Sequence, residues 1–220
     1  MSAWLPELLI MISQKRHLAA ILFTGTEGER YKGTLPDPEA DAWRKLYHEI
    51  LTAHHEVFGG RIVNYYGRGS VSLFGCTLDA MRCARSMQKE LLTTGNKNVR
   101  MGLHIGEVLD EKEDVMGASV NQAARIQALG IPGSVVFSDI VFAQIRNQPE
   151  FKVTSLGRFR VKNIPGKVRT YALKERGIVV PSRTDILKYQ HIYRIQMRLR
   201  TPLQIVQMLM RVIGTHFSLS

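Results

Sequence analysis

Two groups of residues in this chain are of types that can bind a phosphate or a metal ion. Gly67-Arg68-Gly69 could cradle a phosphate, but it lacks the third glycine of a dinucleotide-binding loop and precedes a predicted strand rather than a helix. His48, His54 and His55 share one predicted helix, yet they lack the spacing and the glutamate of a zinc protease. We therefore expect surface or half-buried histidines, and neither group by itself predicts a catalytic or metal centre.

The elements that would position a site follow from hydrophobic patterning. Residues 18–24 (LAAILFT) form a nearly unbroken apolar run, which is typical of a buried strand. Further strands are predicted at 61–66, 70–74 and 100–106, and helices at about 38–58 and 76–92. This order is that of a ferredoxin-like βαββαβ core, so we expect an α+β fold with an antiparallel sheet backed by helices.

The rest of the chain adds shorter elements and a tail. The sequence predicts a helix at 119–129, a short helix capped by Ser138, and strands at 135–137, 151–155, 159–161 and 168–173. We divide the chain into an N-terminal extension (1–15), a domain (16–178) and a basic helical tail (179–220).

Composition limits the class of protein and its partners. The chain has 220 residues, of which 45% are hydrophobic, and this excludes disordered, collagen-like and disulfide-stapled chains. The net charge of +11 favours anionic partners such as nucleotides, nucleic acid or membrane headgroups. Cys76 and Cys83 would lie roughly 10 Å apart on one helix, too far for a disulfide. No apolar run approaches the ~20 residues of a membrane span, so we expect a cytoplasmic protein.

The tail combines basic and apolar residues. Beyond Pro181, six lysines and arginines accompany the single acid Asp185. One helical face carries Ile186, Tyr189, Tyr193 and Met197. We expect the tail to pack on the domain or on a neighbouring subunit, and the alternative is attachment to a membrane surface through a basic amphipathic helix. Nucleic acid is disfavoured as a partner because no recognised binding motif is present.

Several stretches of the sequence resemble the catalytic domain of the class III adenylate and guanylate cyclases. They are residues 16–24 (RHLAAILFT), 59–63 (GGRIV), Gly67-x-Gly69 with 71–74, 102–108 (GLHIGEV), 117–128 (GxxVNxAARIxA), 156–157 (LG) and 161–165 (VKNIP). The resemblance covers about residues 16–175 in the right order. It implies the same α+β fold that the patterning predicts.

The resemblance also implies a reaction, in which a ribose 3′-hydroxyl attacks the α-phosphate of a nucleoside triphosphate with two divalent metal ions assisting. In the family, two aspartates hold the metals, and the matching positions here are Gly25 and Arg68. Loss of both carboxylates and gain of a cation predict that magnesium binding is lost. Glu27 is an alternative ligand, although a shift of two residues along a tight loop rarely keeps octahedral geometry.

The positions that match the family's base-binding and phosphate-binding residues differ in how well the residue type is retained. The base-reading positions implied by the resemblance are Asn64 and Ala118, of which only Asn64 can hydrogen-bond, so base specificity is not readable. Asn121 and Arg125, four apart on one helical face, match the ribose-orienting and transition-state residues, and Lys162 matches the lysine of the triphosphate tail. Helix capping and surface charge are the alternative explanation of these three, but their joint retention favours an anion site.

These observations predict a cyclase-homology domain in cyclic-nucleotide signalling that dimerises but is inactive by itself, a pseudoenzyme with a regulatory or nucleotide-binding role and no cofactor of its own. One alternative is the subunit of a heterodimer that supplies Asn121, Arg125 and Lys162 to the magnesium or manganese site of an intact cyclase. Another is an active homodimeric cyclase with atypical metal ligands such as Glu27. A nucleoside triphosphate and, through the tail, a membrane surface are the further partners considered.

Overall fold

The apolar run at residues 18–24 forms the middle of strand β1 (Lys15–Thr26), an interior strand of the eight-stranded sheet in the described residues. The computed structural model describes residues 15–26, 38–66, 69–95, 99–111, 114–161, 164 and 166–198. The other strands are β2 (Arg61–Tyr66), β3 (Gly69–Phe74), β4 (Val99–Glu111), β5 (Asp114–Met116), β6 (Val135–Ser138), β7 (Val153–Phe159) and β8 (Val168–Leu173). The helices are α2 (Pro38–Val57), α3 (Thr77–Thr93), α4 (Ala118–Gln127), α5 (Asp139–Ile145) and α6 (Arg183–Arg198).

The strand order is β2-β3-β1-β4-β6-β8-β7, with β5 paired to β4. Strand β1 runs antiparallel to both β3 and β4, and among the strands that the structure describes only β4 and β6 pair in parallel. The first six elements therefore have the predicted ferredoxin-like arrangement. The fold class expected from the sequence is confirmed.

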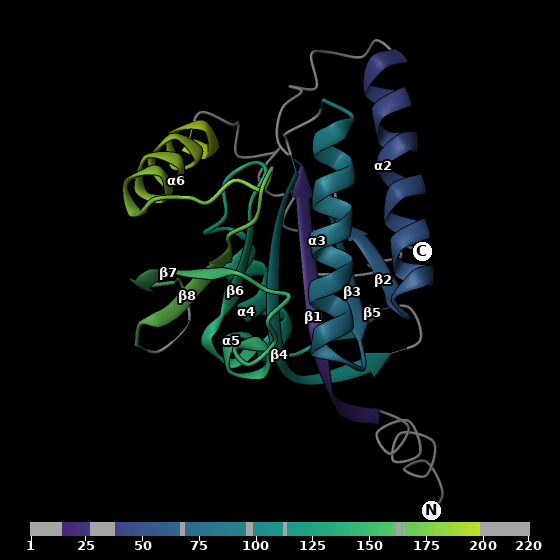
Figure 1. Cartoon of the computed structure of the whole chain (residues 1–220), viewed down its shortest axis with the longest axis horizontal. Coiled ribbons are helices and arrows are strands. Elements are labelled where there is room, and N and C mark those ends of the chain that lie inside the picture. Colours follow the sequence, from purple (N-terminus) through teal and green to yellow (C-terminus); the bar gives the residue numbers. More distant parts are fainter. Residues whose placement is uncertain are drawn as a thin grey trace, which may run out of the picture.

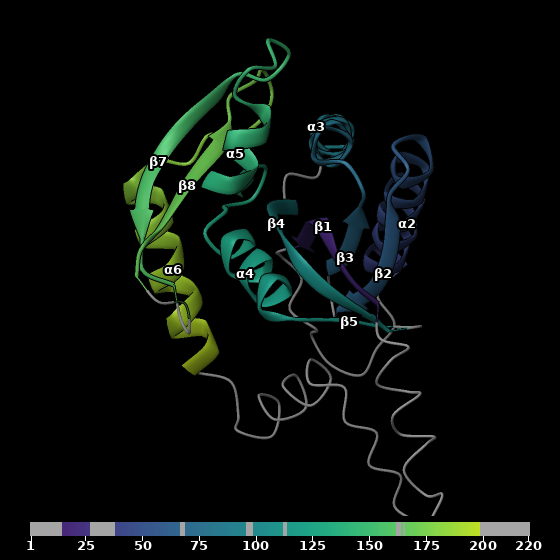
Figure 2. The ribbon, with the colours of Figure 1, turned by 90° about the horizontal axis from the view of Figure 1, so that it is seen from below.

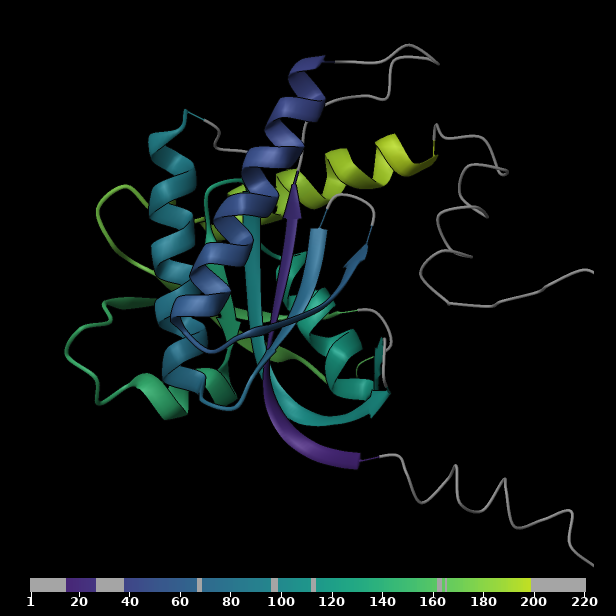
Figure 3. The same cartoon turned by 90° about the vertical axis from the view of Figure 1, so that its right-hand side faces the viewer.

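Two layers of helices cover the sheet. Helices α2 and α3 lie on one face and α4 lies on the other (Figures 1 and 2). Strand β1 serves both layers because its side chains alternate: Ala20 and Leu22 pack toward α2 and α3, whereas Ala19 and Ile21 pack toward α4. Figure 3 shows α2 and α3 together on one side of the strands.

The structure differs from the sequence-based predictions in three features. Strand β5 was not predicted, because its three residues form a strand only by pairing with the long β4. The strands expected at 151–155 and 159–161 are one strand, β7, whose pairing with β8 shifts between Ser155 and Gly157. The third is the histidine on the inner side of α2: His55 is 2% exposed, not half-buried.

His55 is buried because it packs between α2 and α3. Its Nδ1 donates to the Leu51 carbonyl at 2.6 Å, and the Cys83 Sγ lies 4.0 Å from the same nitrogen. Burial lowers the pKa of His55 and raises the pKa of Cys83 to about 12. Both cysteines are free, as their spacing predicts.

Candidate active site

The end of β1 and the start of β3 lie directly side by side. Gly25 is the register partner of Gly69, so residue 25 lies next to the first residue of β3. Gly69 permits this close approach, since a Cβ there would collide with the Thr24 carbonyl oxygen. Arg68 itself lies outside the described residues. Gly25, one of the two positions that the sequence resemblance assigns to metal-binding aspartates, thus lies beside the strand that follows the other position in the sequence.

A buried hydroxyl network holds these two strand ends from the α2 side of the sheet. The Thr24 Oγ1 lies 2.8 Å from the Ser70 Oγ and accepts a hydrogen bond from the Ser70 backbone N–H at 2.9 Å. The Tyr47 hydroxyl of α2 also hydrogen-bonds Thr24 Oγ1. Burial raises the pKa of Tyr47, so the phenol stays neutral and keeps this bond. The network fixes the register at the candidate site.

On the opposite face, the space beside Gly25 is filled by the side chain of Gln127, the last residue of α4. A Cβ on residue 25 would overlap the Gln127 Nε2 and lie 3.3 Å from its Cδ. Gln127 is 8% exposed, so its carboxamide is packed against the strand rather than directed into water. The sequence reading did not single out Gln127 as part of the site.

Helix α4 reaches β1 and β4 so closely because β4 carries glycines where the helix crosses it. A Cβ at Gly102 would lie 2.5 Å from the Gln127 Cβ and would also overlap backbone atoms of Gln127. At the other end of α4, a Cβ at Gly106 would lie 2.5 Å from the Ser119 Cβ. The spacing of Gly102 and Gly106 on one face of β4 was the available sequence signal for this docking.

The groups beside Gly25 do not fit a two-magnesium centre. Gln127 offers a neutral carboxamide, and the neighbouring strands offer backbone carbonyls, whereas magnesium sites of this kind use carboxylates. In the described part of the chain, no group of three or more His, Cys, Asp or Glu side chains is arranged to hold a metal ion. Glu27, the alternative ligand, lies outside that part.

The phosphate and ribose positions lie away from Gly25 within the same chain. Asn121 and Arg125 project from the exposed side of α4, whereas Val120, Ala123, Ile126 and Gln127 form its buried side. Arg125 precedes Gln127 by two residues, so it points about 200° around the helix from the side chain at Gly25. Lys162 is among the residues that the structure does not describe.

The two base-reading positions lie on different elements. Asn64 is half-buried on β2 at a register shift, and its Oδ1 accepts a hydrogen bond from the Tyr65 backbone N–H at 2.7 Å. Ala118 is exposed as the first residue of α4. The amide nitrogen of Asn64 is therefore the group of this pair that can donate to a base edge.

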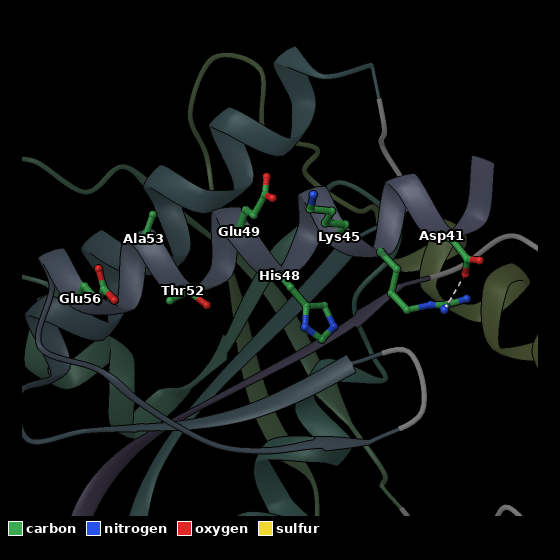
Figure 4. A pocket seen from close by; sticks show the side chains of 8 residues that line it. Asp41, Lys45, His48, Glu49, Thr52, Ala53 and Glu56 are labelled. Carbon is green, nitrogen blue, oxygen red and sulfur yellow. Dashed lines mark ion pairs between the residues drawn. The ribbon is translucent and has the colours of Figure 1, made fainter. Parts of the chain in front are cut away.

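Two hollows on the described surface lie elsewhere. One follows the outer side of α2, where Asp41 pairs with Arg44 at 2.8 Å among side chains of mixed charge (Figure 4). The other, of about 200 Å³, lies near His17 and Arg61, toward the opposite end of β1 from Gly25. Gly25, Asn121 and Arg125 line neither of these two hollows.

Comparison with known proteins identifies the domain. Residues 69–175 match the model of the adenylate and guanylate cyclase catalytic domain. The structure of an adenylate/guanylate cyclase/hydrolase from Silicibacter pomeroyi superposes with a TM-score of 0.68 at 29% identity, covering 74% of this chain and 99% of that one. This chain carries a cyclase-homology domain of the adenylate and guanylate cyclase type.

Other relatives of the cyclase-homology domain are more distant or longer. The adenylyl cyclase CyaB from P. aeruginosa shares the fold with a TM-score of 0.64 at 17% identity, over 76% of this chain and 100% of that chain. A protein of Rhizobium meliloti (strain 1021), "Putative adenylate cyclase 3", is 28% identical over 185 residues, which are 77% of this chain and 31% of the relative. An uncharacterized protein of Mycobacterium tuberculosis (strain ATCC 25618 / H37Rv) is 31% identical over 59% of this chain and 46% of its own length. The chain thus spans from 31% to 46% of the length of these curated relatives.

The described helices of the cyclase-homology domain do not include one that is long and apolar enough to cross a membrane.

Proposed function

We propose that this cyclase-homology domain makes no cyclic nucleotide by itself and acts as a dimeric regulatory or nucleotide-binding module in cyclic-nucleotide signalling. The observation that carries the proposal is at Gly25. The position that the family uses for a metal-binding carboxylate has no side chain, and the Gln127 carboxamide occupies the space where one would begin. A neutral amide does not provide the negative charge that concentrates magnesium at a triphosphate.

The role of a second chain rests on the orientation of α4. Asn121 and Arg125 are on its exposed side, turned away from Gly25 of the same chain. Their side chains therefore point away from a phosphate bound next to Gly25 of the same chain. A phosphate held by another molecule that faces α4 is accessible to them. One solved relative, the guanylyl cyclase domain of a fusion protein from Blastocladiella emersonii, is described as dimeric, and it shares the fold of this chain with a TM-score of 0.61 at 18% identity.

The same orientation favours a second candidate function. In a heterodimer with an intact cyclase, the partner would supply the metal carboxylates and its own magnesium or manganese, and this chain would supply Asn121, Arg125 and Lys162. Arg125 is suited to this role because a guanidinium stays charged and binds phosphate oxygens through several N–H groups.

An activity assay tests both functions. The purified chain is incubated with Mn²⁺ and each of the four nucleoside triphosphates, alone and mixed with an intact cyclase from the same cell. Alone it should form no cyclic nucleotide above background. In the mixture, the heterodimer function requires product above that of the partner alone, and Arg125→Ala should abolish this excess.

Arg146→Ala, an exposed arginine at the end of α5, is the matched control and should leave the excess unchanged. Cyclic nucleotide made by the wild-type chain alone would show that it is an active cyclase and would refute the proposal. Absence of any excess in the mixture would leave the inactive module as the function.

A further inference from the structure

The net charge of this protein is concentrated in one part of the chain. Residues 151–198 contain twelve lysines and arginines against two acidic residues, whereas residues 1–150 contain sixteen against seventeen. The segment from 151 to 174 has seven basic residues and no acid. A charge this segregated produces a positive potential on the surface formed by β7, β8 and α6 rather than over the whole molecule.

The β7–β8 hairpin at the edge of the sheet places like charges opposite each other. Arg158 and Arg169 are register partners, and Lys152 meets Lys174, whose backbone N–H donates to the Lys152 carbonyl at 2.7 Å. Like charges directly across a strand pair destabilise it. The hairpin therefore carries a repulsion that an external anion would relieve.

The two acids of this region neutralise little of its charge, although Asp185 interacts electrostatically with Lys188. Glu175 lies 3.6 Å from Arg85 and 2.5 Å from Lys89 of α3, and Asp185 accepts hydrogen bonds from Ser182. We define the basic surface by six exposed side chains: Arg158, Arg160, Lys167, Arg169, Arg183 and Lys188. None of the six forms an ion pair with any residue that the structure describes.

Helix α6 extends the hairpin into a broader surface (Figure 2). The Arg183 guanidinium lies 5.1 Å from the Phe159 ring centre and donates to the Arg158 carbonyl at 3.4 Å. Ile186 faces inward and is fully buried, while Leu187 is 51% exposed. The apolar face of this part of α6 is thus occupied by the domain, and its outer side presents basic groups with an aliphatic side chain among them.

We propose that the basic surface binds the anionic headgroups of a lipid bilayer. Lysine and arginine near an anionic membrane add attraction without requiring a pocket or a fixed geometry, which suits charges spread over a strand edge and a helix. The exposed apolar side chains beside the charges, Val180 and Leu187, are aliphatic. The described aromatic side chains of this region, Phe151, Phe159, Tyr171 and Tyr189, are buried or half-buried, so bases would find no stacking platform.

Vesicle sedimentation of the full chain tests this proposal, independently of any nucleotide. The wild-type protein should bind vesicles rich in phosphatidylserine and not vesicles of phosphatidylcholine alone, and high salt should release it. Arg158→Glu with Arg169→Glu should weaken binding at least about 25-fold, at about fivefold for each basic residue removed. Arg44→Glu with Lys45→Glu on α2 makes the same change in charge and should bind like the wild type.

A single variant separates binding from folding. Arg169→Glu places an acid opposite Arg158, so it should keep or raise the melting temperature while it weakens vesicle binding. Equal vesicle binding by the wild type and both hairpin variants would overturn the proposal. Tighter binding to duplex DNA or to single-stranded RNA than to vesicles at the same salt, lost in the same variants, would also overturn it by making the surface a nucleic-acid site.

Discussion

The absence of a side chain at residue 25 has two effects: it removes a carboxylate, and it leaves the space that the Gln127 side chain fills. The Gln127 carboxamide overlaps the place of a Cβ on residue 25, and Gln127 is 8% exposed. Restoring an aspartate at residue 25 therefore demands that this carboxamide move. Gly25→Asp with Arg68→Asp should gain metal affinity before it gains turnover, since Asn64 and Ala118 still position a base poorly.

A mutant cycle measures the contact between Gly25 and Gln127. In the wild-type background, Gly25→Ala should lower the free energy of unfolding by about 1–2 kcal/mol because the new methyl displaces the carboxamide. In the Gln127→Ala background the same change should be neutral or stabilising. Urea denaturation gives both values, and Gly75→Ala, whose Cβ would meet nothing within 4 Å, is the control. Equal costs in the two backgrounds would mean that the two residues are not in contact.

His104 predicts a pH dependence of stability. The ring is 2% exposed, its Nδ1 lies 2.9 Å from the Ser138 Oγ, and burial lowers its pKa from 6.5 to about 4. Because the folded-state pKa is depressed, the unfolded chain takes up a proton first as the pH falls. The stability that the neutral ring contributes is therefore complete above about pH 6.5 and is lost toward pH 4.

The loss attributable to His104 is on the order of 3 kcal/mol over that window. Urea denaturation at a series of pH values should show a shallower decline for His104→Gln than for the wild type. Gly75→Ala, which changes no titratable group and whose Cβ would meet nothing within 4 Å, is the control and should keep the wild-type decline. Identical slopes for the wild type and His104→Gln would contradict the prediction.

At the scale of elements, the candidate site depends on how deeply α4 sits on the sheet. Gly102 allows the backbone of Gln127 to approach β4, and Gly106 makes room for Ser119. Both ends of the helix are thus fixed by close packing against one strand. This packing sets which side of α4 faces Gly25 and which side presents Asn121 and Arg125.

Gly102→Ala should lower the free energy of unfolding more than Gly25→Ala does. The new methyl would meet the backbone and Cβ of Gln127, which cannot swing aside, so the free energy of unfolding should fall by about 3 kcal/mol or more. Gln127→Ala should not rescue it, because alanine keeps those atoms. A rescue as large as that expected for Gly25→Ala would show that α4 is held less rigidly than the structure indicates.

Periodicity was sufficient to predict the elements that position the site, but not their fine contacts. The apolar run of β1 and the glycines at 59–60 gave strand and helix ends within a few residues, since burial and chain reversal act locally. Strand β5 and the single β7 depend on pairing with strands distant in sequence, which one sequence does not reveal. Gln127 was missed for the same reason: its importance comes from Gly25, about a hundred residues earlier.

At the scale of the whole molecule, the start of the basic tail belongs to the folded core. Ile186 of α6 is fully buried in a cluster with Ile126, Leu129, Val136, Leu156, Phe159 and Ala172. One turn later, the ring of Tyr189 packs against the Arg100 guanidinium, which lies 5.2 Å from the centre of the tyrosine ring. The packing expected of the tail is seen in this part, and residues 199–220 lie outside the described structure. Helix α6 thereby packs, in one apolar cluster, against the C-terminal end of α4 and the β7–β8 hairpin.

This packing predicts what the tail contributes to stability. Ile186→Ala should lower the free energy of unfolding by about 2–4 kcal/mol, because it leaves a cavity in a closed apolar cluster. Leu187→Ala removes a similar side chain that is 51% exposed, so it should stay within about 0.5 kcal/mol of the wild type. Truncation after Val180 removes all of α6 and uncovers the cluster, so it should lower the melting temperature or change the mass measured by light scattering. A truncated domain of unchanged mass and stability, together with equal values for the two single variants, would show that α6 does not stabilise the domain.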